Sequence, residues 1–257
     1  MMHCGIGITA STPLPHTPIH PGITGSEAIV TSKQPMKSAT HLRSLGLALA
    51  TAALALPAPS ATWSTTAQYG QYNFSNGYSV NNDIWGSGAG PQTLYVNTGS
   101  SSAPNFWAAS NQPNTGGIKS YPHMAKTINQ SITGISSLTG TYSISGGTGA
   151  YDWAFDCWVP SEVMVWTKWA GAVGPWGSLY QSNVSIGGHS YNVYQPGGPW
   201  SFLRTSQSSS SSDNLAAIFK WLVNNHHLSN GTIGSCQYGV EITSGNSTWT
   251  VNSSSIK

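Results

Sequence analysis

Charged residues are scarce in this sequence. Only 6% of its 257 residues are Asp, Glu, Lys or Arg. From residue 62 onward six basic residues face six acidic ones, so the net charge of this part is near zero. Proteins that bind nucleic acid carry a basic patch or stripe. This part has no basic patch, and we expect no nucleic-acid partner.

Cysteine is also rare. The chain has three, and their spacing forms no C-x-x-C pair or other cluster of metal ligands. We therefore expect no metal site and no cofactor. Cys4 lies far upstream, which leaves Cys157 and Cys236. In an oxidising compartment these two residues either form a disulfide or stay as buried free thiols, and the sequence is compatible with both.

The sequence lacks a hydrophobic run long enough to cross a membrane. The apolar run at 45–56 falls short of the roughly 20 residues that a spanning helix needs. Basic residues precede it and the small-residue segment PAPSA follows it, which is the pattern of a secretory signal peptide. We predict an upstream extension (1–35), a signal peptide (36–61) and one folded domain (62–257). The mature protein is expected to be secreted, extracellular and free of the membrane.

Aromatic and neutral polar residues are what the chain has in quantity. All 11 Trp and all 11 Tyr lie in the predicted mature part, among many Ser, Gly and Asn. Such a composition suits a neutral ligand such as a sugar, whose C–H faces stack on rings and whose hydroxyls pair with amides. Six N-x-S/T sequons also permit N-glycosylation, at Asn73, Asn129, Asn183, Asn230, Asn246 and Asn252.

Short strands and turns organise the predicted domain. Segments of alternating character are separated by Gly, Ser, Asn and Pro, which indicates a β-sandwich or barrel. The predicted strands include 93–97, 141–145, 151–158, 162–169, 189–195, 200–206 and 236–243. One segment, 211–225, has helical periodicity, with Asp213 as the expected N-cap. We expect this single amphipathic helix to pack on the outside of a sheet.

Two glutamates are the chemically informative residues. Glu162 in EVMVW and Glu241 in YGVEITSG are the only glutamates after residue 61, and both lie in predicted strands. A charge on a strand that is buried on both faces is strongly disfavoured, so each should open into a polar groove. Two carboxylates on one sheet face are what retaining glycoside hydrolysis requires. The alternative is two unrelated surface glutamates.

A wider set of motifs decides between these alternatives. The segments VNNDIWGSGAG, GIKSYPH, YDWAFD, EVMVW, GPWG and YGVEITSG occur in this order. Together they resemble glycoside hydrolase family 12, the small secreted endoglucanases and xyloglucanases, over nearly all of the mature part. The resemblance implies an all-β jelly roll of two curved antiparallel sheets, with one helix and an open concave cleft. It implies retaining hydrolysis of internal β-1,4-glucosidic bonds.

The resemblance also implies the roles of individual residues. Glu162 matches the family's nucleophile and Glu241 its general acid/base. Asp156 matches an aspartate that holds the nucleophile by a short hydrogen bond. Trp85 matches a tryptophan platform for a distal sugar, and Asp83 lies where the family usually has asparagine. Met164 and Trp166 share the strand face of Glu162, so they should line the cleft floor.

One feature departs from the family pattern. Only CWVPS separates Asp156 from Glu162, where the family usually has a longer connection. A tight three-residue turn is predicted to place these two residues directly opposite each other.

Alternative functions and the places of four further residues can also be considered from the sequence. A non-catalytic carbohydrate-binding jelly roll and a xyloglucan-specific enzyme remain alternatives, whereas the absence of G-x-S-x-G argues against a serine hydrolase. We expect a monomer that is most active in mild acid. Trp107, Trp153 and Trp249 are expected in the core or on a sheet surface, and His123 in a loop.

Overall fold

A computed structural model describes residues 61–99, 103–195 and 197–257 of the chain. The predicted upstream extension and signal peptide lie, apart from Ala61, outside the described residues. Within the described part no helix is long and apolar enough to cross a membrane.

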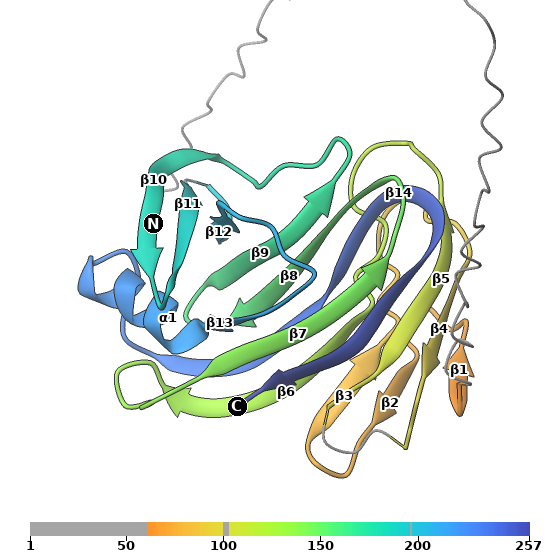
Figure 1. Cartoon of the computed structure of the whole chain (residues 1–257), viewed down its shortest axis with the longest axis horizontal. Helices are drawn as coiled ribbons and strands as arrows, with labels where there is room; N and C mark the ends of the chain where they lie inside the picture. The colour runs from red at the N-terminus through yellow and green to blue at the C-terminus, as the bar shows by residue number, and fades with distance from the viewer. Residues whose placement is uncertain (1–60, 100–102, 196) are drawn as a thin grey trace, which may run out of the picture. The chain divides into compact units, whose positions relative to one another are not determined.

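Fourteen strands and one helix make up the part of the chain that the structure describes (Figure 1). The strands are β1 (Trp63–Thr65), β2 (Gln71–Asn73), β3 (Tyr78–Asn81), β4 (Gln92–Val96), β5 (Phe106–Gln112), β6 (His123–Ser131), β7 (Thr139–Gly146), β8 (Ala150–Trp158), β9 (Glu162–Ala170), β10 (Ser178–Ile186), β11 (His189–Gln195), β12 (Trp200–Arg204), β13 (Ser210–Asn214) and β14 (Thr232–Ile256); the helix is α1 (Leu215–Asn224). The predicted all-β class with one helix is confirmed.

The strands form two sheets that share β14. Sheet A has the order β1-β4-β5-β14-β7-β13, and sheet B has the order β2-β3-β6-β14-β8-β9-β12-β11-β10. All described pairings are antiparallel except β9 with β12, which run parallel. The long curved strands of sheet B are visible in Figure 1.

Strand β14 passes from one sheet to the other at Gly245. Its pairing with β8 ends at Ser244, and its pairing with β5 begins at Gly245. Gly245 has a φ of 138°, and a Cβ there would lie 2.1 Å from the carbonyl oxygen of Thr148. Only glycine fits this bend. Because Glu241 lies four residues earlier, the bend fixes where its strand leaves the cleft.

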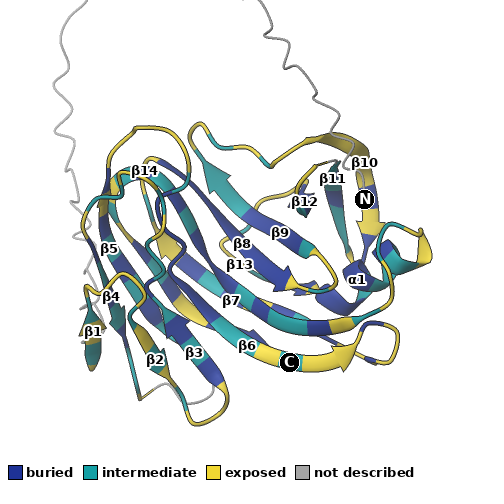
Figure 2. Ribbon diagram, turned by 180° about the vertical axis from the view of Figure 1, so that it is seen from behind, coloured by how far each residue is buried: buried dark blue, intermediate teal, exposed yellow. Residues whose placement is uncertain are grey.

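Alternation along the strands separates the core from the outer faces (Figure 2). Val163 and Val165 belong to the core between the sheets, whereas Met164 and Trp166 form part of a separate buried cluster. The core also includes Tyr238, Val240 and Ile242, which share one face of β14. The predicted facing of these strands is confirmed. It follows from the period of two in a β-strand.

Helix α1 differs from the prediction in its N-cap. Its N-cap is Asn214, whose side chain accepts a hydrogen bond from Ala217 N, and not Asp213. Asp213 is instead buried, with Tyr191 Oη donating to its Oδ1 at 2.6 Å and Arg204 Nε 3.6 Å from the same atom. The buried face of α1 belongs to the core between the sheets. The helix therefore packs its apolar face against the sheets, as expected for an amphipathic helix, and closes the core.

Of the remaining expectations about the core, those for the two tryptophans are confirmed and the one for His123 is wrong. Cys157 and Cys236 are paired residues of β8 and β14, both buried as free thiols, so the disulfide alternative is not realised. Trp153 and Trp249 lie in the core, as expected. His123 is not a loop residue, because it begins β6 and is buried there.

Candidate active site

The outer face of sheet B carries a small apolar cluster away from the main core. Ala154, Met164, Trp166 and Leu203 are buried there, with Trp169, Val173 and Tyr194 packed against them. This cluster forms the floor on which the acidic residues of the site lie. A carboxylate beside such a floor loses part of its hydration, which raises its pKa.

Glu162 is the first residue of β9 and directly follows a tight turn. Residues 159–161 form the turn, in which Val159 N donates to the carbonyl of Ser161 at 3.1 Å. Across the hairpin Glu162 pairs with Trp158. The side chain is half-buried, and burial raises the pKa of its carboxyl above the ordinary value. Glu162 therefore lies at an accessible end of the floor.

Asp156 does not face Glu162 directly, so this part of the prediction is wrong. Its cross-strand partner is Met164, which places Glu162 on the diagonal, two residues along β9. Asp156 is buried, and its Oδ1 has no hydrogen-bond partner. Burial, followed by the negative charges of Glu162, Glu241 and Asp83, raises the pKa of Asp156 to about 8. The group is thus protonated at neutral pH and available as a donor.

Glu241 faces a carboxyl group that sequence reasoning missed. Asp152 is its cross-strand partner on β8. Burial raises the pKa of Glu241 to about 7, the hydrogen bond with Asp152 lowers it, and the charge of Glu162 raises it. Because Glu162 affects the pKa of Glu241, the two glutamates share one electrostatic environment.

Asp152 holds the proton of this pair. It is buried, and burial, the charge of Glu241 and the hydrogen bond with Glu241 all raise its pKa well above the ordinary value. Protonated Asp152 donates to Glu241. The alternation of β8 could have identified it, because Asp152, Ala154 and Asp156 share one face of that strand.

Asp83 and His123 lie beside this group. Asp83 adopts a left-handed backbone conformation with φ of 40°, and burial raises the pKa of its carboxyl. Its Oδ2 lies 3.7 Å from His123 Nδ1. Burial lowers the pKa of His123 to about 4, and its Nδ1 lies 2.6 Å from the carbonyl of Tyr121. The histidine is therefore neutral at neutral pH, and the contact with Asp83 is not an ion pair.

Two contiguous hollows extend from the acidic group. A cavity of about 200 Å³ is lined by Asp152, Glu241 and Trp166, together with Thr243 and the loops at 117–118 and 172–174. A larger cavity of about 840 Å³ shares residues 117–118 with it. This second hollow is lined by Trp85 and Trp176, which are 50% and 68% exposed. Together the hollows form the cleft.

Trp176 is a second residue that sequence reasoning missed. It lies in GPWG, which carried part of the family resemblance but no assigned role. Lys119 lines the same hollow, and its Nζ donates to the backbone carbonyls of Ser87 and Gly116 at 2.8 and 2.5 Å. These bonds tie together the two loops beside Trp85. The cleft thus ends in two exposed indole rings, and Trp85 lies beside this tied loop pair.

Acidic residues are concentrated at this site. Of the six in the described part of the chain, five belong to the electrostatic group around the cleft: Asp83, Asp152, Asp156, Glu162 and Glu241. No group of His, Cys, Asp and Glu among the described residues has the geometry to hold a metal ion. The arrangement combines an accessible carboxylate with a second carboxyl that is protonated near neutral pH. Such a pair can attack and protonate opposite ends of one bond.

The sequence model of the protein family Glycosyl hydrolase family 12 matches residues 76–257 of this chain. The chain belongs to glycoside hydrolase family 12. Among solved structures, the xyloglucanase domain of NopAA, a type three effector from Sinorhizobium fredii in complex with cellobiose, is 35% identical. The match covers 77% of this chain and 99% of that chain, with a TM-score of 0.71.

Other members of the family show the same fold. Endoglucanase 3 of Trichoderma harzianum is 27% identical, over 76% of this chain and 96% of that chain, with a TM-score of 0.71. Endoglucanase cel12A of Rhodothermus marinus, at 19% identity and a TM-score of 0.68, supports the fold alone. The family assignment confirms the expected jelly roll and the expected hydrolase of β-glucans.

Proposed function

We propose that this glycoside hydrolase cleaves internal β-1,4-glucosidic bonds with retention, using Glu162 as nucleophile and Glu241 as general acid/base. The observation that carries the proposal is that the two glutamates differ in accessibility and in protonation. Glu162 lies at an accessible strand end, whereas Glu241 is buried against Asp152 with its pKa raised to about 7. One glutamate is thus suited to attack and the other to carry a proton in mild acid.

The two steps follow from these states. The Glu162 carboxylate attacks the anomeric carbon while the Glu241 carboxyl gives its proton to the departing glycosidic oxygen. Glu241, now ionised, takes a proton from water, and the resulting oxygen attacks the same carbon and releases Glu162. Asp156 is protonated in this pH range and lies on the diagonal from Glu162, so it can donate a hydrogen bond to the nucleophile. We therefore propose this positioning role for Asp156.

Asp152 has the complementary role toward the acid/base. Its proton lies toward Glu241 and lowers the pKa of that carboxyl, against the opposing effect of burial. The pKa of Glu241 is thereby kept near the range in which it can both lose and regain a proton. Asp152 acts through Glu241, as a positioning residue.

Substrate binding is assigned to the cleft. Trp85 and Trp176 offer exposed ring faces for sugars distant from the cleaved bond, and the Met164 and Trp166 side chains form the floor beneath the reacting sugars. Asp83 lies near Asp156 and would accept hydrogen bonds from sugar hydroxyls. We assign linear β-1,4-glucan as the preferred substrate. The 35% identity to a domain described as a xyloglucanase supports xyloglucan as the second candidate.

Secretion and oligomeric state complete the proposal. A β-glucan polymer is an extracellular substrate, and the predicted signal peptide agrees with that location. We propose that the enzyme acts as a secreted monomer, since all the proposed catalytic groups lie on one chain.

Product release from carboxymethylcellulose, barley β-glucan and tamarind xyloglucan tests the proposal. The enzyme should cleave at least one polymer, with the ranking of rates identifying its substrate. Glu162→Gln should lower kcat by roughly three orders of magnitude or more while leaving polymer binding intact. Binding without cleavage by the unsubstituted protein would instead favour a non-catalytic carbohydrate-binding jelly roll.

A further inference from the structure

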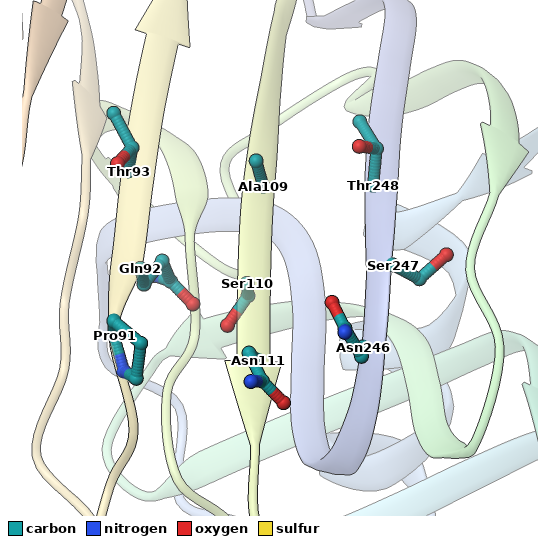
Figure 3. Close-up of a pocket in the computed structure, with 9 residues that line it drawn as sticks. All are labelled: Pro91, Gln92, Thr93, Ala109, Ser110, Asn111, Asn246, Ser247 and Thr248. Carbon is teal, nitrogen blue, oxygen red and sulfur yellow. The ribbon is translucent and has the colours of Figure 1, made fainter.

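A further hollow lies on the outer face of sheet A, and none of the proposed catalytic residues lines it. Its volume is about 400 Å³. Figure 3 shows its lining residues on three adjacent strands, β4, β5 and β14. They are Pro91, Gln92, Thr93, Ala109, Ser110, Asn111, Asn246, Ser247 and Thr248.

The shape of this hollow follows from one small residue. Ala109 pairs with Thr93 on one side and Thr248 on the other, so the three form a row across the sheet. The central methyl is shorter than its two neighbours. Asn111 and Asn246 pair in the next row and present amide groups at one end. The result is a shallow trough lined by hydroxyls and amides.

An aromatic pair borders the trough at the other end. Tyr95 and Trp107 are cross-strand partners in the row two residues beyond Ala109. Their rings stack with centroids 5.4 Å apart and planes 13° apart. Both side chains are partly exposed, because Leu94 and Phe106 take the core-facing positions beside them. The pair holds a rigid aromatic surface on an otherwise polar sheet.

The strands around the trough also carry no charge. Strands β1, β4, β5 and β7 contain no Asp, Glu, Lys or Arg, nor does β14 from residue 244 onward. An ionic ligand would find no counter-charge here. Rings, hydroxyls and amides without charge match a neutral polysaccharide, whose sugars present C–H faces and hydroxyl edges.

We propose that the trough bordered by Tyr95 and Trp107 is a second, non-catalytic binding site for a β-1,4-linked glucan chain. It goes beyond the proposed function of the cleft, since the trough contains no carboxylate and cannot hydrolyse a bond. A polymer bound on sheet A raises the local concentration of chain segments available to the cleft. The site should therefore affect long substrates and leave short ones unchanged.

Asn246 sets a condition on the test. It begins the sequon Asn246-Ser247-Thr248, and it lines the trough. An N-glycan at this position would cover the site. The protein should therefore be made in a bacterial host, which adds no such glycan.

The experiment is an amide-resolved NMR titration of Glu162→Gln protein with cellohexaose. Two separate sets of amides should shift: one on β8 and β9 at the cleft, and one on β4 and β5 beside the trough. Adding Tyr95→Ala and Trp107→Ala together should weaken the affinity that the second set of amides reports by roughly tenfold or more. Removing two rings costs about this much stacking energy. The first set should keep its affinity.

Two matched variants make the result decisive. Tyr95→Phe with Trp107→Phe keeps both rings and should retain the second set of shifts. Ala109→Arg fills the trough from a solvent-facing position and should abolish that set. The proposal is overturned if β4 and β5 do not shift in the starting protein, or if their shifts persist unchanged in the alanine and arginine variants. Loss of the cleft set alone would count against the proposed function and leave this site standing.

Discussion

Asp152 and Glu241 lie directly opposite each other on β8 and β14, and the buried aspartate shares a hydrogen bond with the glutamate. Burial raises the pKa of both carboxyls, so the pair cannot ionise fully at neutral pH. This pairing links the proposed acid/base to a residue that never needs to touch the substrate. It leads to a prediction about the pH dependence of the enzyme.

Asp152→Ala should shift the alkaline limb of kcat/KM to higher pH. Burial raises the pKa of Glu241, and the hydrogen bond with Asp152 lowers it. Removing this hydrogen bond should therefore raise the pKa of Glu241 above about 7. Asp152→Asn keeps an N–H donor and should leave the limb near its original position. Initial rates between pH 4 and pH 9 measure both. An identical limb in all three proteins would show that Asp152 does not act on Glu241.

The stability of the protein should fall as pH rises from about 4 to 8. Asp156 has an unfolded pKa of about 3.9 and a folded pKa of about 8. Between these values the folded state binds more protons than the unfolded state, so the free energy of unfolding decreases with pH. The stabilising contribution is complete below the unfolded pKa and is lost as pH rises through the folded one.

Asp156→Asn separates this effect from other titrations. The variant should lose much of the pH dependence and should be more stable than the parent at pH 8. The parent's melting temperature should drop by roughly 7–14 °C between pH 5 and pH 8, if about 3.5 kcal/mol is lost at ~2–4 °C per kcal/mol. Thermal unfolding at several pH values checks this. A parent that is more stable at pH 8 than at pH 5 would contradict the burial of protonated Asp156.

The stereochemistry of the product tests the spacing of the two glutamates. Along β8, Glu241 is level with Asp152 and Glu162 with Trp158, so the two are staggered along the cleft. Retention requires carboxyl groups about 5–5.5 Å apart, whereas inversion uses about 6.5–9.5 Å. We expect retention, because the proposed role of Glu162 as nucleophile requires it. Proton NMR of the first anomer released decides, and an α-anomer would require a water between the carboxyls.

The faces of the central strands could be predicted from sequence, but their register could not. A period of two assigns Met164 and Trp166 to one face and Val163 to the other, whatever the strand pairs with. Register depends on the turn. Here the turn closes through Val159 and Ser161 and sets Glu162 opposite Trp158, so Asp156 came to lie on the diagonal.

Residues that meet only in the folded chain were the ones missed. Asp152 and Glu241 are 89 positions apart (241 − 152 = 89), and no local pattern joins them. Trp176 meets Trp85 through loops, whose path a single sequence does not determine. Asp213 looked like a helix cap because it precedes an apolar run, but Tyr191 and Arg204 from other strands bind it instead.

Trp176 should contribute to polymer binding on the same scale as Trp85. Both exposed rings line the hollow at one end of the cleft, and neither packs in a core cluster. Trp176→Ala should raise KM for the preferred polymer by roughly 3–10-fold, since aromatic contacts are worth about 0.5–1.5 kcal/mol beyond burial, and it should leave kcat nearly unchanged because the ring lies away from the carboxyls. Trp176→Phe keeps a stacking face and should recover most of the loss. If Trp85→Ala raises KM and Trp176→Ala does not, the sugar rests on Trp85 alone, and the loop bearing Trp176 serves only as the rim of the cleft.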